Sequence, residues 1–291
     1  MPAQPSPPAI KLELLYTNIG RGHPFYLDGI LEALIRSGQI RLIRRETDVF
    51  TVSRGLSRRA WQFARWLYRS GSSGGMSGQL YRFFRRGADY NRPGLGLRLM
   101  GRDIKRRYAL SADPVLVAHP TLVGILAGRE NLLYQHGELV APEESIVNGA
   151  ATVFVPTEEV ALRFVSSGYA RERVVVSGLC IEPALVRQAA DSYRARGERL
   201  VGDGPLTGAW FSSGAEPKQH LAAIIPAARS VLNKGHRAII FAQVGGQLAW
   251  LVERQLAPGF GLQVSSASNP VTDESSSLTL VLHENRREEN G

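Results

Sequence analysis

Residues 153–183, VFVPTEEVALRFVSSGYARERVVVSGLCIEP, contain a short apolar strand, a helix and a second apolar strand in that order. Thr157 is placed to cap the helix, because a threonine oxygen accepts a hydrogen bond from a free backbone N–H of the first turn. Glu158 and Glu159 follow in that turn, where the helix dipole favours negative charge, and we expect both to be structural. A strand, a helix and a strand in succession predict a parallel α/β unit.

The same alternation extends along the rest of the chain. Short apolar segments bounded by Gly, Pro or capping residues predict further strands at residues 10–19, 40–50, 114–120 and 131–137. A second series of strand, loop, helix and strand begins at residue 206, after a polar stretch that contains Gly and Pro. The sequence therefore predicts an α/β fold with two Rossmann-like domains.

The expected domain boundaries follow from these two series. Residues 1–9 are a flexible Pro-rich tail, residues 10–183 the first domain, residues 184–205 a linker and residues 206–291 the second domain. Doubly wound domains usually exceed about 100 residues, so we expect the second domain to be truncated.

Composition and charge favour a soluble globular protein with one strongly basic region. The 291 residues are 44% hydrophobic and 21% charged, and the formal net charge is +9. Residues 1–110 hold 20 Lys and Arg against 7 Asp and Glu, whereas residues 111–291 hold 15 against 19. The basic excess is densest in an insertion at residues 52–110, with 14 basic and 2 acidic side chains, and such a block attracts a polyanion.

Several classes of protein are disfavoured. The single cysteine, Cys180, excludes an intramolecular disulfide and a cysteine-based metal cluster, and the histidines lack the spacing of a metal site. No run of about 18 uncharged apolar residues occurs, and the first residues lack the basic-then-apolar order of a secretory signal. We therefore expect a cytoplasmic protein without a metal site.

Residues 55–86 combine arginine with aromatic side chains. If residues 56–69 are helical, one stripe is apolar and consists of Leu56, Ala60, Phe63, Ala64 and Leu67, with arginine opposite. This pattern is typical of an interfacial helix on an anionic membrane. The side chains expected to reach the membrane are Arg58, Arg59, Trp61, Arg65, Trp66, Arg69, Phe83, Phe84, Arg85 and Arg86.

Two other interpretations of this segment stay open. A helix packed against its own domain would also leave an arginine face in solvent. Nucleic acid is another polyanion that arginine and stacking aromatic rings bind, but the sequence contains no DNA- or RNA-binding motif, so we rank it below a membrane.

A glycine turn, GRGHP at residues 20–24, follows the first expected strand and opens a helix. Gly20 and Gly22 lack the third glycine of a dinucleotide fingerprint, which disfavours NAD. Backbone N–H groups at a helix N-terminus still favour an anion or hydroxyl ligand. His23 therefore lies either beside a ligand or only at the cap of its own helix.

Other candidate side chains follow later strands. His119 ends one expected strand, and His136 with Glu138 ends the next, so all three would lie at the cleft edge of a parallel sheet. A carboxylate beside an imidazole can orient it and raise its basicity. Loop histidines next to Pro or Gly also commonly satisfy backbone groups, so both interpretations stay open.

The GRGHP turn, the central AHP and above all residues 153–183, which end GLCIEP, resemble the first domain of certain two-domain glycosyltransferases. That family includes the diacylglycerol galactosyl- and glucosyltransferases and the peptidoglycan lipid-intermediate N-acetylglucosaminyltransferase. The resemblance, over roughly residues 10–245, implies a GT-B fold, with acceptor lipid bound by the first domain and sugar nucleotide mainly by the second. It also implies that His23 is a general base or positions the acceptor hydroxyl, with His119, His136 and Glu138 as further catalytic candidates.

The second domain offers candidates for the donor diphosphate in its first loop, FSSGAEPK, at residues 211–218. Helix N-termini bind phosphate, which favours Ser212, Ser213, Gly214 and the nearby Lys218. Gly245 and Gly246 occupy the corresponding loop after the next strand. Either turn would also serve as a plain capping loop.

The resemblance thus implies a peripheral glycosyltransferase on the inner face of the cell membrane that moves a sugar from a UDP-sugar to a lipid hydroxyl of the diacylglycerol type. Its expected partners are the nucleotide sugar, the lipid acceptor and an anionic membrane surface, and no cofactor is required. Two other functions stay open. One is a non-catalytic membrane- or nucleotide-binding protein, and the other is a sugar-nucleotide epimerase of the same fold, which would not need residues 55–86.

Overall fold

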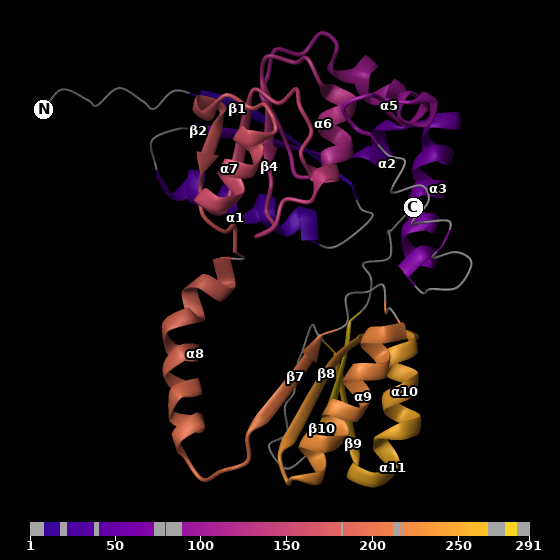
Figure 1. The fold of residues 1–291 in the computed structure, drawn as a ribbon, viewed down its shortest axis with the longest axis vertical. Helices are drawn as coiled ribbons and strands as arrows, with labels where there is room; N and C mark the ends of the chain where they lie inside the picture. The colour runs from indigo at the N-terminus through magenta and orange to yellow at the C-terminus, as the bar shows by residue number, and fades with distance from the viewer. Residues whose placement is uncertain are drawn as a thin grey trace, which may run out of the picture. The chain divides into compact units, whose positions relative to one another are not determined.

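The computed structural model describes residues 9–17, 22–37, 41–72, 79, 89–181, 183–211, 216, 218–266 and 277–283. The chain divides into two compact units, residues 1–65 with 84–189 and residues 66–83 with 190–291. Each unit contains its own parallel sheet with helices between the strands (Figure 1). The expected α/β class with two Rossmann-like sheets is therefore confirmed.

The first sheet has six parallel strands in the order β2-β1-β3-β4-β5-β6. Its strands are β1 (Ala9–Tyr16), β2 (Arg41–Asp48), β3 (Val115–Val117), β4 (Leu132–Gln135), β5 (Thr152–Val155) and β6 (Val174–Val176). Each coincides with a segment that the sequence predicts as a strand. The central strands are short apolar runs because a parallel sheet with helices on both faces buries both sides of each strand.

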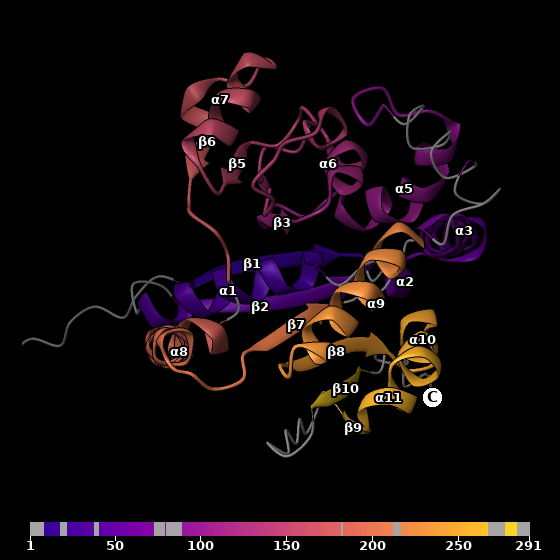
Figure 2. The same ribbon diagram turned by 60° about the horizontal axis from the view of Figure 1, so that its bottom comes forward.

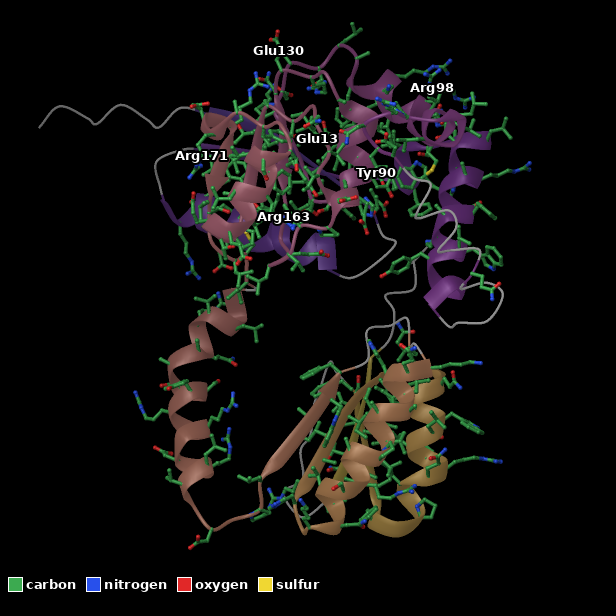
Figure 3. The ribbon with its side chains drawn as sticks, viewed as in Figure 1. Glu13, Tyr90, Arg98, Glu130, Arg163 and Arg171 are labelled. Atoms are coloured by element: carbon green, nitrogen blue, oxygen red, sulfur yellow. The ribbon has the colours of Figure 1, made fainter. Side chains whose placement is uncertain are left out.

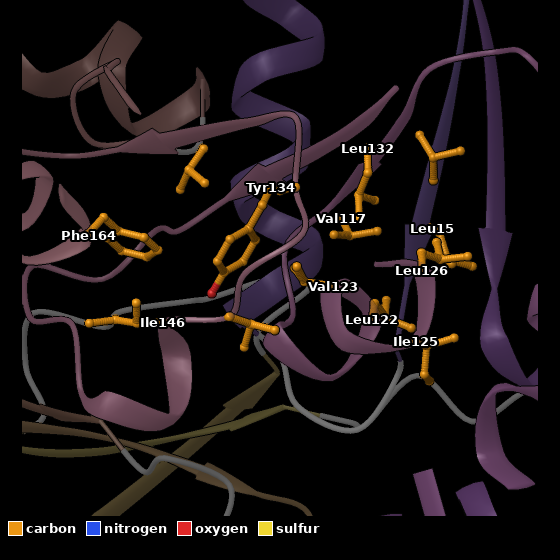
Figure 4. Packing of buried hydrophobic residues seen from close by; sticks show 14 of the residues in the cluster. Leu15, Val117, Leu122, Val123, Ile125, Leu126, Leu132, Tyr134, Ile146 and Phe164 are labelled. Atoms are coloured by element: carbon orange, nitrogen blue, oxygen red, sulfur yellow. The ribbon is translucent and has the colours of Figure 1, made fainter. Parts of the chain in front are cut away.

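Helices cover both faces of this sheet. Its helices are α1 (Gly22–Ser37), α2 (Val49–Val52), α3 (Gly55–Ser72), α5 (Leu95–Tyr108), α6 (Pro120–Leu126) and α7 (Glu158–Ser166), with short turns η1 (Glu143–Ser145) and η2 (Arg171–Arg173). On one face, Leu27 and Leu31 of α1 pack with alternate residues of β1 and β3. On the other face, Leu15 and Val117 pack with α6 and with Tyr134 of β4 (Figure 4).

The α7 unit has the expected helix cap. The Thr157 Oγ1 accepts a hydrogen bond from the Val160 backbone N–H at 3.3 Å. Glu158 and Glu159 lie in the first turn, and Glu158 also pairs with Arg171 at 3.0 Å. Val160 and Phe164 are buried, so the helix packs on the sheet through its apolar side.

The second sheet has four parallel strands in the order β7-β8-β10-β9. They are β7 (Thr207–Phe211), β8 (Arg237–Gln243), β9 (Leu262–Ser266) and β10 (Leu278–His283), preceded along the chain by α8 (Pro183–Val201). The helices α9 (Lys218–Asn233), α10 (Gln247–Gln255) and α11 (Ala257–Phe260) complete this unit. A separate core forms where Ile225 of α9 and Val252 of α10 pack with Ile240 of β8 and Leu280 of β10.

Candidate functional site

The boundary between β1 and β3 is a topological switch point in the first sheet (Figure 2). The chain passes from β1 to β2 on one side and returns to β3 on the other side of β1. Open parallel sheets bind ligands outside the carboxyl ends of their strands at such a point. The residues just beyond those ends are Thr17 after β1 and His119 after β3, which makes this edge the candidate acceptor site.

His119 is the N-cap of α6, and its ring is partly exposed. Its Nδ1 accepts a hydrogen bond from the Thr121 backbone N–H at 3.1 Å. A neutral imidazole carries one proton, so this bond assigns the proton to Nε2. His119 can therefore donate a hydrogen bond from Nε2 to a ligand oxygen, and the role of proton acceptor falls to another group.

Thr17 and His119 follow the carboxyl ends of two neighbouring strands. Leu15 and Val117 form the last pair in the register of β1 and β3, and Thr17 and His119 each lie two residues beyond that pair. The Thr17 side chain is fully buried, and its Oγ1 has no hydrogen-bond partner among the described residues. Such a hydroxyl is costly in free energy and is a feature that functional sites retain. Thr17 cannot be recognised from the sequence, because its burial depends on neighbouring strands.

Part of the expected GRGHP turn falls outside the described residues, including Gly20. Gly22 begins α1 and His23 is its second residue, but the His23 side chain is also outside the described part of the chain. Further along α1, a Cβ on Gly29 would lie 2.9 Å from the Ile181 carbonyl oxygen. Helix α1 therefore packs closely on the backbone of the GLCIEP segment.

His136 lies in the core of the first unit. Its Nε2 is 3.0 Å from the Val140 carbonyl oxygen, and its Nδ1 is 3.4 Å from the Tyr134 hydroxyl. The ring also packs against Phe164, and burial lowers the pKa of His136. Glu138 is exposed. His136 thus contacts a backbone carbonyl and a phenol, which suits the interpretation that this histidine satisfies structural groups.

A buried carboxylate on β1 was not among the predicted residues. The Glu13 Oε1 accepts hydrogen bonds from Tyr108 Oη at 2.7 Å, from Thr47 Oγ1 at 2.8 Å and from an Arg107 guanidinium nitrogen at 3.3 Å. Burial alone would raise the pKa of Glu13, but these three donors together hold that pKa below its ordinary value. Glu13 on β1 therefore connects that strand to α5 and β2 inside the unit. Another side chain of α5, Arg98, points outward from the unit (Figure 3).

The structure corrects the expected membrane role of Trp61. Its side chain is fully buried, and the indole N–H donates to the Met100 carbonyl oxygen at 3.0 Å. Ser57 Oγ donates to the same carbonyl at 2.8 Å, so α3 packs on α5 through this side. The Arg65 guanidinium lies 4.4 Å from the centre of the Phe50 ring and so faces its own domain.

The apolar stripe that we expected α3 to turn toward a membrane is divided between the surface and the core. Leu56 and Phe63 are 57% and 49% exposed, and Trp66 is 53% exposed, whereas Leu67 is buried. Arg58 and Arg59 are also exposed. The side chain of Arg69 and all of Phe83, Phe84, Arg85 and Arg86 lie outside the described residues. The described surface of α3 therefore combines apolar, aromatic and cationic side chains.

Helix α5 contributes a second exposed row. Its members recur at helical spacing and are Leu95, Arg98, Leu99, Arg102 and Arg106. Leu95 is 84% exposed, and Leu110 just beyond the helix is 99% exposed. Apolar and basic side chains thus share the exposed face of α5, as they do on α3.

At the carboxyl edge of the second sheet, the expected phosphate loop is only partly described. Ser212, Ser213 and Gly214 lie outside the described residues, and Lys218 begins α9 as an exposed residue. Gly245 has φ +68° and Gly246 caps α10. The α10 N-terminus is occupied by a side chain of the same chain, because the Glu216 Oε2 accepts from the Gln247 and Leu248 backbone N–H groups at 2.5 and 3.1 Å. Glu216 is not among the residues predicted from the sequence.

Two general properties bear on the chemistry. In the described part of the chain, no group of three or more His, Cys, Asp or Glu side chains could hold a metal ion. Among those same residues, no helix has the length and apolar character needed to cross a bilayer.

Comparison with protein-family models and with curated proteins gives no match to this chain.

Proposed function

We propose that this chain is a peripheral membrane glycosyltransferase of the GT-B type that transfers a sugar from a UDP-sugar to the hydroxyl of a diacylglycerol-type lipid. The observation that carries the proposal is the presence of two all-parallel α/β sheets, each with its own core and its own carboxyl edge. Parallel sheets bind ligands at that edge, so one chain offers a separate place for each of two substrates.

The first sheet is assigned to the acceptor. Thr17 and His119 follow the carboxyl ends of β1 and β3 at its switch point, and the Nε2 proton of His119 suits the oxygen of a hydroxyl group. His23 follows the same strand β1 at the start of α1. We assign the acceptor hydroxyl to this edge, with His119 as a hydrogen-bond donor that positions it and His23 as the general base.

The proposed reaction is a single displacement or its two-step equivalent at the anomeric carbon of the sugar. The acceptor oxygen forms a bond to that carbon, and the bond from the carbon to the diphosphate oxygen breaks. The hydroxyl proton passes to the His23 imidazole, and UDP leaves with the bonding electron pair. Positive charge from Lys218 and from backbone N–H groups of the first loop of the second sheet would stabilise the leaving diphosphate.

Membrane docking is assigned to the exposed rows of α3 and α5. Leu56 and Leu95 supply apolar contact, and Arg58, Arg59 and Arg98 supply charge complementary to anionic lipid. Each basic side chain near such a surface contributes about 1 kcal/mol, so a few of them hold a protein on a membrane without an anchor. A lipid acceptor is favoured over a soluble one because these rows would bring the first sheet to the bilayer.

Calorimetric titration of the full chain with UDP tests the donor half of this proposal. We expect binding at one site, and no heat at millimolar UDP would overturn it. Turnover of a UDP-sugar by the His23→Ala variant tests the acceptor half. We expect loss of turnover with UDP affinity unchanged, because His23 belongs to the other sheet, whereas full turnover would remove His23 from the site.

A further inference from the structure

A groove of about 330 Å³ runs between helices α9 and α10 of the second unit. The two helices run in the same direction, because each follows the carboxyl end of one of two parallel strands, β7 and β8. Lys218 and Gln247, the first residues of the two helices, line one end of the groove. Arg229 and Gln255 line the other end. Each end therefore carries one cationic and one amide side chain.

The middle of the groove is apolar. Leu221 and Ile225 of α9 are buried beneath it, and the partly buried Leu251 of α10 faces them. Ala222 and Pro226 are exposed along the α9 side of the groove. The distance between two packed helices depends on the side chains at their contact, so these two small residues allow another helix to approach α9 closely.

An aromatic side chain and a third cation lie beside the groove on α10. Trp250 and Arg254 each come one position before a residue that lines the groove, so they occupy the neighbouring stripe of the helix. Trp250 is 51% exposed, and the Arg254 guanidinium lies 5.1 Å from the centre of its ring. Tryptophan and arginine are among the side chains that most often carry binding energy at protein interfaces. The neighbourhood of the groove thus has the composition of a protein-binding surface.

We propose that this groove binds an acidic amphipathic α-helix of a partner protein. The lining from Lys218 to Arg229 extends about 16 Å along α9, the length of about three helical turns. A bound helix would place apolar side chains at i, i+4 and i+7 over the middle of the groove and acidic side chains at its two cationic ends. A lipid with a single charged head group would use only one of these ends, so the pattern favours a helix.

Arg229 is the best placed cation for a carboxylate of the partner. It is exposed and donates to the Gln255 carbonyl oxygen at 2.9 Å. A guanidinium has several N–H donors in a planar fork, so Arg229 can bind a carboxylate as well. At the opposite end, the Glu216 carboxylate already binds the first turn of α10. That negative charge weakens the attraction of an acidic partner to Lys218, which is also assigned to the donor, so the test concerns Arg229 and the middle of the groove.

Fluorescence polarisation of a labelled synthetic peptide with the full chain tests the proposal. The probe is a helical peptide of about 14 residues, or about four turns, with leucine at i, i+4 and i+7, glutamate near both ends and alanine elsewhere. We expect saturable binding that weakens as salt rises, because salt screens contacts between exposed charges. The same peptide with glutamine in place of glutamate should bind about tenfold more weakly.

Two substitutions in the groove have matched controls. Ala222→Trp fills the middle of the groove, whereas Ala223→Trp adds the same side chain at an exposed position about 100° further around α9. The first should weaken peptide binding at least tenfold, and the second should leave it unchanged. Arg229→Glu should weaken binding about tenfold, or about 1.4 kcal/mol, and should bind a peptide with lysine in place of glutamate more tightly than the wild type does. Lys234→Glu, at an exposed position just beyond α9, is its control.

Several results would overturn the assignment. If the wild type does not bind the acidic peptide at about 0.1 mM, the groove has no such partner. Equal binding by the wild type, Ala222→Trp and Arg229→Glu would place the peptide elsewhere on the chain, and equal binding of the glutamine peptide would show that the partner is not acidic. A loss of binding to anionic vesicles in Ala222→Trp would make the groove a lipid site, and a loss of self-association would make its occupant a second copy of the chain.

The peptide experiment is independent of the proposed transferase activity. A wild-type chain that binds the peptide and no UDP would keep the groove as a helix-binding site and refute the donor function. A chain that binds UDP and no peptide would do the reverse.

Discussion

Glu13 is a buried charge whose three donors come from other parts of the first unit. Thr47 is 34 residues away in sequence, and Tyr108 is 95 residues away. A buried carboxylate is stable only when donors compensate the loss of water, and here their effect on the pKa exceeds that of burial. The hydrogen-bonded ionised form therefore stabilises the unit above the ordinary carboxyl pKa.

Stability should consequently fall in acid because of Glu13. Its pKa is lower in the folded chain than the ordinary value of 4.5, so its contribution is complete above about pH 4.5 and is lost as the pH falls through the folded value. Glu13→Gln should lower the free energy of unfolding by about 1–3 kcal/mol at pH 7 and flatten its decline toward pH 3. Urea unfolding at several pH values measures both effects. The exposed Glu130→Gln is the control, and an equally steep acid decline in Glu13→Gln would contradict this role.

His119 combines a helix cap with the proposed contact to the acceptor, and one substitution separates the two. Asparagine is also a good N-cap, so His119→Asn should keep the free energy of unfolding within about 0.5 kcal/mol of the wild type. It should lower turnover at least tenfold and leave UDP affinity unchanged, because the lost Nε2 proton belongs to the acceptor side. Steady-state kinetics measure the turnover, and calorimetry measures the UDP affinity. Full turnover would show that the cap is the whole role of His119.

At the scale of elements, strand positions could be predicted from sequence and helix orientation could not. Inner strands of the first sheet such as β3, residues 115–117, are apolar runs, because a sheet covered on both faces leaves no polar side. The burial of Trp61 and Leu67 on α3 could not be predicted, because a helical wheel contains two overlapping apolar arcs. Only the bonds from Ser57 and Trp61 to the Met100 carbonyl show which arc is covered.

Two site residues were not predicted because their neighbours in the fold lie far away in the sequence. Glu216 looks like an ordinary loop residue, since its partners Gln247 and Leu248 are about 30 positions away. Thr17 gives no signal until β1 and β3 are neighbours. His119, in contrast, was found because a histidine before proline at the end of an apolar run has a local signature of a strand followed by a helix.

The exposed side chains of α3 predict which variants lose membrane binding. Arg58→Ala with Arg59→Ala should weaken binding to anionic vesicles about 30-fold at low salt, from about 1 kcal/mol for each side chain. Arg163→Ala with Arg173→Ala on the exposed surface of the α7 region is the matched control. Trp61→Phe should instead destabilise the fold and leave vesicle affinity unchanged. Co-sedimentation measures the binding, and equal binding to neutral vesicles would contradict the electrostatic account.

The close approach of α1 to the GLCIEP segment predicts opposite effects for two glycine substitutions. Alanine normally stabilises a helix by up to about 1 kcal/mol relative to glycine. Gly29→Ala should nonetheless destabilise the chain by about 1–3 kcal/mol, because its Cβ would overlap the Ile181 carbonyl oxygen. Gly259→Ala meets no such neighbour and should be neutral or stabilising. Thermal unfolding measures both changes, and a stabilising Gly29→Ala would show that α1 does not pack this closely.

At the scale of the whole molecule, the two sheets divide the proposed chemistry. The first unit supplies the acceptor edge with Thr17 and His119 and the basic surfaces of α3 and α5. The second unit supplies Lys218 at the start of α9, and its Glu216 caps α10. Donor and acceptor variants should therefore change different kinetic constants, His119→Asn affecting the acceptor and Lys218→Ala affecting the donor.

The most direct test of the glycosyltransferase claim is product formation on a membrane. The full chain is incubated with UDP-glucose or UDP-galactose and anionic vesicles that contain diacylglycerol, and lipid products are identified by mass spectrometry. We predict glycosylated diacylglycerol in an amount equal to the UDP released, with no product from His23→Ala. A wild-type chain that binds the vesicles and forms no glycolipid from either donor would contradict the account.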